Sequence, residues 1–277
     1  MVTSRSVRLY TRAAAVAVIV CSAVPAWAQY RPQALNDPPT GEKFHIEANA
    51  GFWSPSADMK IASEALGIAG TTIDLKTDLG LTDQRFRELQ LTLRPARAHK
   101  FRLQYIPINY VQTGTLKRTV VFNGQAYNIG IPVNSSLDWK AYRIGYEYDF
   151  LVRNQGFAGF ILEAKYTDIN VSLASPVVAT QFAHARAPIP ALGGIGRVYV
   201  VPNISITGEV TGFKLPTTID KRYGAHYVDV DIYGTVNFNN YVGAQLGYRS
   251  LDVFYLVKSD TGSLTMKGLY FGIVARY

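Results

Sequence analysis

Twelve charged side chains alternate with apolar residues in segments that have the pattern of β-strands. Because successive side chains of a strand point to opposite faces, these charges share the face opposite the apolar residues. Carboxylates and cations on one face can neutralise one another as ion pairs, which we expect, or they can line a gated path for small solutes. The candidates are Glu47, Glu88, Arg102, Arg143, Glu147, Glu163, Lys165, Arg197, Glu209, Asp229, Asp231 and Arg249.

The four histidines do not form a recognisable catalytic pattern. His226 lies three residues before Asp229, so on a strand the two side chains face opposite sides and cannot act as a local acid–base pair. We expect His184 to lie in a loop without a nearby acid, and no spacing typical of metal ligands is present. We therefore expect no catalytic residue, no metal and no cofactor, with a lipid- or peptide-hydrolysing enzyme as the alternative.

Ten segments of alternating polarity position these charges. The clearest is 137–150, where Tyr142, Ile144 and Tyr146 alternate with Arg143, Gly145 and Glu147. The ten predicted strands are 44–53, 86–94, 99–110, 137–150, 157–173, 191–200, 204–213, 225–238, 241–257 and 264–277.

The links between these strands alternate in length, which predicts the topology. Short turns on one side and longer loops on the other are typical of transmembrane barrels with an even number of antiparallel strands. The fold class is therefore all-β, an up-and-down barrel of about ten strands, with eight as the alternative and a soluble β-sandwich as the competing fold. The short links are 95–97, 152–156, 201–203 and 239–240; the longer ones are 54–85, 111–136, 174–190, 214–224 and 258–263.

Two of the longer links carry signals of their own. The Ala-rich stretch 56–70 predicts a short helix in the first external loop. Asn123-Gly124, between 119–122 and 125–127, is a strong hairpin signal, so we expect the strands 99–110 and 137–150 to extend beyond the membrane there.

The last strand ends on an aromatic residue at the C-terminus. Phe271, Ile273 and Tyr277 share its apolar face, and we expect this strand to close the barrel against the strand that starts at Phe44. An alternating strand that ends in an aromatic residue resembles the C-terminal strand of bacterial outer-membrane β-barrels.

The N-terminus has the pattern of a secretory signal peptide. Arg5, Arg8 and Arg12 precede the apolar segment 13–20, and Ala26-Trp27-Ala28 fits a cleavage site. We expect a signal peptide over 1–28, a periplasmic leader over 29–42 and a barrel over 43–277. The single cysteine, Cys21, falls in the signal peptide, so the mature chain has no thiol and no disulfide.

The formal net charge of +8 favours an anionic partner. For an exported barrel, lipopolysaccharide phosphates are nearer than nucleic acid, which we do not expect as a partner. The basic residues that we assign to these contacts are Lys117, Arg118, Lys221 and Arg222. An exposed basic loop surface without a partner is the alternative.

The signal peptide, the alternating strands and the C-terminal aromatic together resemble small bacterial outer-membrane β-barrels, broadly those of the OmpA and OmpW types. The resemblance covers the whole mature chain. It implies an outer-membrane location, contact with outer-membrane lipid and lipopolysaccharide, insertion by the assembly machinery and a monomer. Ten strands leave at most a narrow lumen. The expected function is structural or a narrow small-solute pore, with an enzyme or an adhesion or ligand-binding barrel as alternatives.

Overall fold

The structure is a computed structural model that describes residues 39–62, 70–220, 222–257 and 260–277. Within these ranges, no helix is long and apolar enough to cross a membrane. The predicted signal peptide and residues 29–38 of the predicted leader lie outside the described residues. The strands are β1 (Ile46–Ala62), β2 (Ile73–Asp74), β3 (Phe86–Ala96), β4 (His99–Thr115), β5 (Val120–Phe122), β6 (Gln125–Tyr127), β7 (Pro132–Arg153), β8 (Gly156–Ala174), β9 (Gln181–Val201), β10 (Ile204–Asp220), β11 (Tyr223–Asn237), β12 (Val242–Val257) and β13 (Asp260–Arg276).

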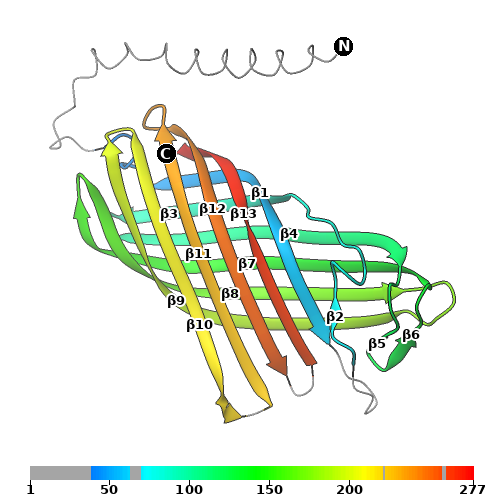
Figure 1. The fold of residues 1–277 in the computed structure, drawn as a ribbon. Coiled ribbons are helices and arrows are strands. Elements are labelled where there is room, and N and C mark those ends of the chain that lie inside the picture. The colour runs from blue at the N-terminus through cyan, green and yellow to red at the C-terminus, as the bar shows by residue number, and fades with distance from the viewer. Residues whose placement is uncertain (1–38, 63–69, 221, 258–259) are drawn as a thin grey trace, which may run out of the picture. The chain divides into compact units, whose positions relative to one another are not determined.

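Ten of the strands close into an antiparallel barrel (Figure 1). Sequence neighbours pair around the ring in the order β1, β3, β4, β7, β8, β9, β10, β11, β12, β13, and β13 then pairs with β1. This confirms the predicted ten-strand up-and-down barrel over the alternative of eight strands.

The C-terminal strand closes the ring along its full length. Phe271 lies opposite Phe52, with ring centroids 5.7 Å apart, and Ile273 lies opposite Ala50. The carbonyl of Tyr277 accepts hydrogen bonds from the backbone N–H groups of His45 and Ile46, at 2.7 and 2.9 Å. The last residue of the chain is therefore part of the barrel wall.

The predicted helix in the first loop is wrong for the residues that the structure describes. Residues 56–62 continue β1 and pair with β13, while residues 63–69 lie outside the described residues. Ala57 and Met59 face inward and are buried, whereas Asp58 and Lys60 face outward. Pairing with β13 and burial of alternate residues outweigh the weak helical preference of an Ala-rich sequence.

The predicted extension of the strands 99–110 and 137–150 is confirmed, because β4 continues to Thr115 and β7 begins at Pro132. Two other strands extend further at their outer ends than the sequence predicted, since β9 begins at Gln181 and β10 continues to Asp220. The predicted Asn-Gly hairpin is present as β5 and β6, with positive φ at Asn123 (48°) and Gly124 (78°) as a type I′ turn requires.

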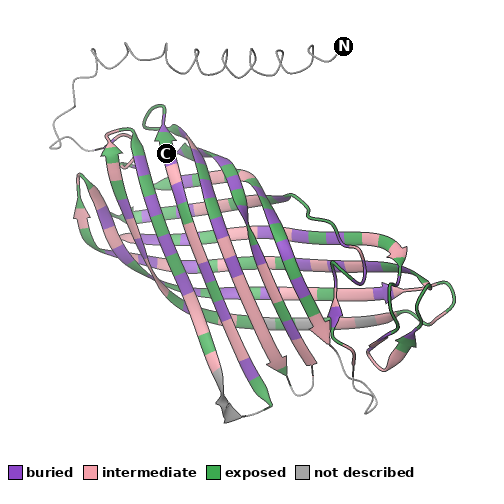
Figure 2. Ribbon diagram, viewed as in Figure 1, coloured by how far each residue is buried: buried purple, intermediate pink, exposed green. Residues whose placement is uncertain are grey.

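Buried and exposed residues alternate along these long strands (Figure 2), but the polarity of the two faces reverses from one part of the wall to the other. On β4, Phe101 and Leu103 face outward and are 49% and 41% exposed, but further along the strand Ile106 and Ile108 face inward and are 4% and 1% exposed. We call the part with apolar outward side chains the apolar band. Members of the band are Phe52, Leu89, Phe101, Leu103, Ile144, Phe160, Leu162, Leu192, Val210, Val228, Ile232, Leu246, Leu269, Phe271 and Ile273.

Three tyrosines mark the outer edge of the apolar band. Tyr105 and Tyr142 stack with ring centroids 4.8 Å apart, and Tyr166 lies 6.4 Å from Tyr142. We call the strand residues beyond these tyrosines, with 70–85 and 116–131, the outer half. There, apolar side chains from the wall, from residues 73–81 and from the β5–β6 hairpin form one core, which includes Trp53, Met59, Ile73, Leu75, Leu79, Leu81, Ile108, Tyr110, Val120, Phe122, Tyr127, Trp139 and Met266.

Candidate functional site

An unbroken chain of ion pairs crosses the lumen inside the apolar band. Each acid within it contacts a cation on either side, and each of the two acids at its ends contacts one cation, so the charges alternate from end to end. In order, it runs Asp149, Lys100, Glu147, Arg102, Glu209, Arg143, Glu163, Lys165, Asp229, Arg249, Glu88. We call these eleven residues the ionic chain.

The ionic chain connects distant parts of the barrel wall. Arg102 on β4 contacts Glu209 on β10 at 2.7 Å, although four steps of the ring separate the two strands. Arg143 on β7 contacts the same carboxylate, and Arg249 on β12 contacts Glu88 on β3 at 3.2 Å. These contacts span the interior rather than follow the wall, so the side chains fill the lumen.

The charges of the ionic chain are deeply buried. The residues Glu147, Glu209 and Asp229 are 2%, 5% and 3% exposed. A buried charge is tolerated only when a counter-charge and hydrogen bonds replace the lost water. Asp229 meets this condition with two hydrogen bonds from Arg249, at 2.9 and 2.7 Å, and an ion pair with Lys165 at 3.2 Å.

The structure brings nine of the twelve predicted lumen charges into the ionic chain. The other three lie elsewhere on the inward face: Glu47 pairs with Arg276, Arg197 lies 3.4 Å from Glu42, and Asp231 accepts a hydrogen bond from the Tyr270 hydroxyl at 3.1 Å. Sequence reasoning missed Lys100 and Asp149. Both lie on the inward face by parity, which was the available signal, but they stand at strand ends next to the short turns.

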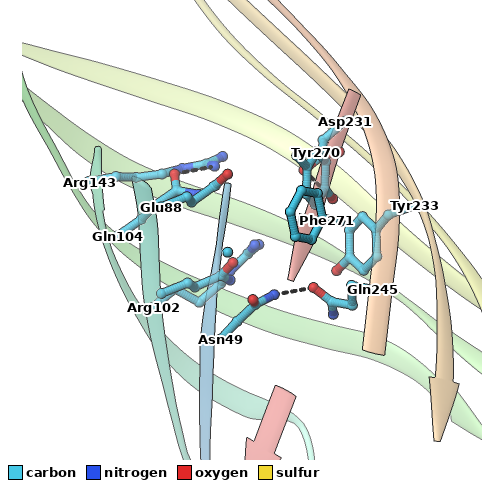
Figure 3. Close-up of a pocket in the computed structure, with 12 residues that line it drawn as sticks. Asn49, Glu88, Arg102, Gln104, Arg143, Asp231, Tyr233, Gln245, Tyr270 and Phe271 are labelled. Atoms are coloured by element: carbon cyan, nitrogen blue, oxygen red, sulfur yellow. Dashed lines mark hydrogen bonds between the residues drawn. The ribbon is translucent and has the colours of Figure 1, made fainter. Parts of the chain in front are cut away.

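A small cavity lies beside the ionic chain, lined in part by amide side chains (Figure 3). Its volume is about 10 Å³, which is roughly the space that one water molecule needs. Figure 3 shows the Asn49 amide hydrogen-bonded to Gln245, and Gln104 donates to Glu88. At this level the side chains of the lumen therefore leave room for about one water molecule.

Residues 39–42, which the sequence assigned to the leader, lie against the short-turn end of the barrel. The Thr40 N–H donates to the Pro202 carbonyl at 2.8 Å, and the Asn237 amide donates to the Thr40 carbonyl at 2.7 Å. Glu42 contacts Arg94 and Arg197 at 3.3 and 3.4 Å. Burial raises the pKa of Glu42, but Arg197, Lys100 and the Tyr199 hydroxyl outweigh it and hold that pKa below its ordinary value.

Two histidines have acid partners that the sequence did not reveal. His184 lies 2.9 Å from Asp168, and His226 lies 2.5 Å from Asp252. The expectation that His184 has no nearby acid is wrong, because β9 extends far enough to place it beside β8. Both pairs are partly exposed and face outward at the outer edge of the apolar band. Among the described residues, neither imidazole is hydrogen-bonded to a serine or threonine hydroxyl.

Three of the predicted lipopolysaccharide contacts, Lys117, Arg118 and Arg222, lie at the long-loop end of the barrel. Arg118 is engaged there, because its guanidinium donates to Asp78 at 2.9 and 2.6 Å and to the Thr72 carbonyl at 2.6 Å. The hydrogen bond from Arg118 lowers the pKa of Asp78 below its ordinary value. Lys117 is exposed, the guanidinium of Arg222 lies 5.8 Å from the Tyr223 ring centroid, and Lys221 lies outside the described residues.

Within the described ranges, the side chains of histidine, cysteine, aspartate and glutamate form no group of three or more that could hold a metal ion. The prediction that the chain needs no metal and no cofactor stays a prediction.

Comparison with known proteins gives a match at the level of the fold. No protein-family model and no curated protein matches the sequence. The solved structure of the outer membrane protease OmpT from Escherichia coli is similar with a TM-score of 0.58 at 7% identity, over 88% of this chain and 100% of that chain. The toluene transporter TodX from Pseudomonas putida gives 0.35 at 8% identity, over 88% and 93%. The translocator domain of the autotransporter NalP from Neisseria meningitidis gives 0.37 at 10%, over 96% and 98%. The similarity to OmpT concerns the closed β-barrel fold alone.

Proposed function

We propose that this chain is an outer-membrane β-barrel with a structural role, whose lumen is closed to solutes at rest. The observation that carries the proposal is the ionic chain, which fills the lumen and leaves beside it a cavity of only about 10 Å³. The apolar band with its row of tyrosines supports the membrane location, since outer-membrane barrels have this outward surface. The finer likeness to OmpA- and OmpW-type barrels rests on the sequence features.

Closure at three successive levels supports this role. Residues 39–42 lie at the short-turn end, the ionic chain fills the interior of the apolar band, and the apolar core fills the outer half. A solute that crosses would have to displace ion pairs buried in a medium of low dielectric, where an unpaired charge is costly.

One observation favours the second candidate, a narrow small-solute pore. Glu88 Oε2 and Asp231 Oδ1 are buried beside the cavity and hydrogen-bond to none of the described residues. Water would satisfy these oxygens. A water-threaded path through the amide-lined side of the lumen would follow from such hydration.

Single-channel recording in planar bilayers tests the proposal. We expect the wild-type mature chain to give no conductance steps, and the Arg102→Gln/Glu209→Gln variant to give small steps, because its contact crosses the lumen. Asp252→Asn, on the outward face, is the matched control and should remain silent. Steady conductance by the wild type would contradict the closed lumen and favour the narrow pore. Heat-modifiable gel mobility reports whether each variant is folded.

We further propose that the outer end contacts lipopolysaccharide, since exposed Lys117 and the neighbouring basic residues suit phosphate groups. Lipopolysaccharide should raise the thermal stability of the wild type more than that of a Lys117→Ser/Arg222→Ser variant. An equal gain in both proteins would argue against this assignment.

We propose no catalytic role. The two His–Asp pairs lie outward at the edge of the apolar band, and each forms a stable contact without a nucleophile bonded to the imidazole among the described residues. Ester or peptide hydrolysis by the membrane-inserted protein, lost in His184→Ala or His226→Ala, would contradict this proposal.

A further inference from the structure

The barrel wall is interrupted between β9 and β10. Their ladder runs from Ile204 opposite Val201 to Gly212 opposite Leu192 and ends there. Beyond this point β9 pairs with β8 alone and β10 pairs with β11 alone. In Figure 1 the two strands diverge toward their outer ends. We call this stretch, residues 181–191 of β9 and 213–220 of β10, the seam.

The sequence explains why the ladder stops. Pro190 and Pro188 are the next two residues of β9 with the same parity as Leu192, and Pro216 lies on the facing part of β10. Proline has no N–H to donate and is tolerated in a sheet where its nitrogen faces an unpaired edge. The prolines therefore keep both edges of the seam from pairing.

The seam begins within the apolar band. Leu192 lies beside Leu162 on β8, and Gly212 lies beside Val228 on β11; both neighbours are outward apolar residues. Tyr166, at the outer edge of the band, lies opposite Pro188, four residues further along β9. The lowest part of the seam is thus level with the outer leaflet of the proposed membrane.

The inner side of the seam is apolar as well. Ile189 on β9 and Phe213 on β10 face inward and pack against the core of the outer half. Below them, Lys165 is held by the Thr211 hydroxyl at 2.9 Å and by the carboxylates of Glu163 and Asp229, at 2.8 and 3.2 Å. The seam thus joins the apolar band to the apolar core of the outer half, and the ionic chain lies directly below this core.

We infer that the seam is a lateral passage through which a linear alkyl chain moves from the outer leaflet into the core of the outer half. An alkyl chain meets apolar side chains on both sides of the wall and needs no hydrogen bond from the two strand edges. A peptide strand, the rival occupant, needs those hydrogen bonds, and the prolines withhold them. This inference goes beyond the proposed function, because the lumen below stays closed.

The chain carries its own reporter of this passage. Trp53 and Trp139 both lie in the core of the outer half and are 0% and 2% exposed. The third tryptophan, Trp27, falls in the predicted signal peptide. Bromine atoms on an alkyl chain quench tryptophan fluorescence on contact. Quenching in the mature chain therefore reports alkyl chains that have reached the interior.

The experiment compares a variant in which a covalent cross-link joins the two edges of the seam (the locked seam) with a control in which a cross-link joins two strands that are already paired (the locked ladder). Pro190→Cys/Lys214→Cys joins the two edges of the seam, and the mature chain should contain no other thiol. The control, Lys214→Cys/His226→Cys, joins residues already opposite each other in the β10–β11 ladder. The cysteines are joined by oxidation, or by a bifunctional maleimide where oxidation fails to bridge the edges.

We expect brominated chains to quench the wild type and the control, and the locked seam to lose this quenching. One arm uses vesicles of phosphatidylcholine with dibromostearoyl chains, and the other adds dibromostearate to the protein in detergent, so the arms separate a membrane lipid from a free fatty acid. Quenching in either arm that the seam lock abolishes supports the passage. Equal quenching in locked and control proteins, or none in the wild type in both arms, overturns it. Bilayer conductance tests the closed lumen separately.

Discussion

The apolar band and the outer half are built from the same strands with opposite polarity. In the band, Leu103 faces outward and Arg102 faces inward; in the outer half, Ile108 faces inward and Asn109 faces outward. The strand geometry is continuous, so the proposed membrane location of the band would explain the difference through what lies outside the wall. Lipid outside favours apolar outward side chains, whereas water outside favours an apolar interior.

The two regions are consequently stabilised in different ways. The interior of the band depends on the ionic chain, in which a lost partner leaves a buried charge uncompensated. The interior of the outer half depends on apolar packing between the wall, residues 73–81 and the β5–β6 hairpin. A substitution inside the band should therefore destabilise the whole barrel, whereas a substitution in the core of the outer half should destabilise only its surroundings.

The largest effect should follow from removal of Arg143, which contacts both Glu163 and Glu209. Arg143→Met leaves these carboxylates buried with one counter-charge fewer, so we expect a loss of about 3–5 kcal/mol in the free energy of unfolding. Urea unfolding of the protein in lipid vesicles, followed by heat-modifiable gel mobility, measures this loss.

Lys140→Met is the matched control, since Lys140 lies on the same strand but faces outward and is exposed. We expect it to change stability by less than about 0.5 kcal/mol. Adding Glu163→Gln to Arg143→Met should recover part of the lost stability, because it removes one of the two buried carboxylates that have lost Arg143 as a partner. Equal losses in the Arg143 and Lys140 variants would mean that the ionic chain contributes no specific stability.

A smaller and local effect should follow from Leu79→Ala in the outer half. Leu79 is 6% exposed in the apolar core, and its truncation should cost roughly 2–5 kcal/mol of local stability. Amide hydrogen exchange should increase in 71–85 and in the β5–β6 hairpin but not in the strands of the apolar band.

Leu269→Ala is the same substitution on the outward face of the band, where lipid can fill the space that the side chain leaves. It should raise amide exchange less than Leu79→Ala does. If Leu79→Ala instead increased exchange throughout the barrel, the two halves would be a single cooperative unit.

The same comparison explains which parts of the fold the sequence could predict. The ten strands and the closing strand were predictable because the band alternates with a constant apolar face. The outer ends of β1, β9 and β10 were missed because the apolar face changes sides there. Two adjacent apolar residues mark the change, Phe52-Trp53 on β1 and Tyr105-Ile106 on β4. That signal could have extended the predicted strands.

The candidate site was predictable in its composition but not in its contacts. Alternation assigns Arg102 and Glu209 to the inward face. It does not give their positions around the ring or their heights in the lumen, and these two residues are 107 apart in the sequence. The His184–Asp168 contact was missed for the related reason that it depends on the full length of β9.

The smallest effect should come from the Asp78–Arg118 pair, which ties 71–85 to the segment before the hairpin. The Arg118 side chain is 44% exposed, so the pair should contribute about 1 kcal/mol or less. The hydrogen bond from Arg118 lowers the pKa of Asp78 below its ordinary value of 3.8. A carboxylate whose pKa is lower in the folded state stabilises that state above its unfolded pKa, and the contribution is lost as the pH falls through the folded pKa.

Limited proteolysis of the folded protein should therefore cut within 71–85 faster as the pH falls below about 4, with an acid-stable protease as the probe. Asp78→Asn should be cut faster than the wild type at neutral pH and should lose part of the acid effect. The remaining part belongs to Asp83, whose carboxylate binds Lys76 at 2.9 Å and the Ala57 N–H at 3.1 Å. An acid effect of the same size in wild type and Asp78→Asn would show that this ion pair does not hold the outer half closed. The acid effect would then belong to the contacts of Asp83 with Lys76 and the Ala57 N–H, and these contacts and the apolar core would hold the outer half closed.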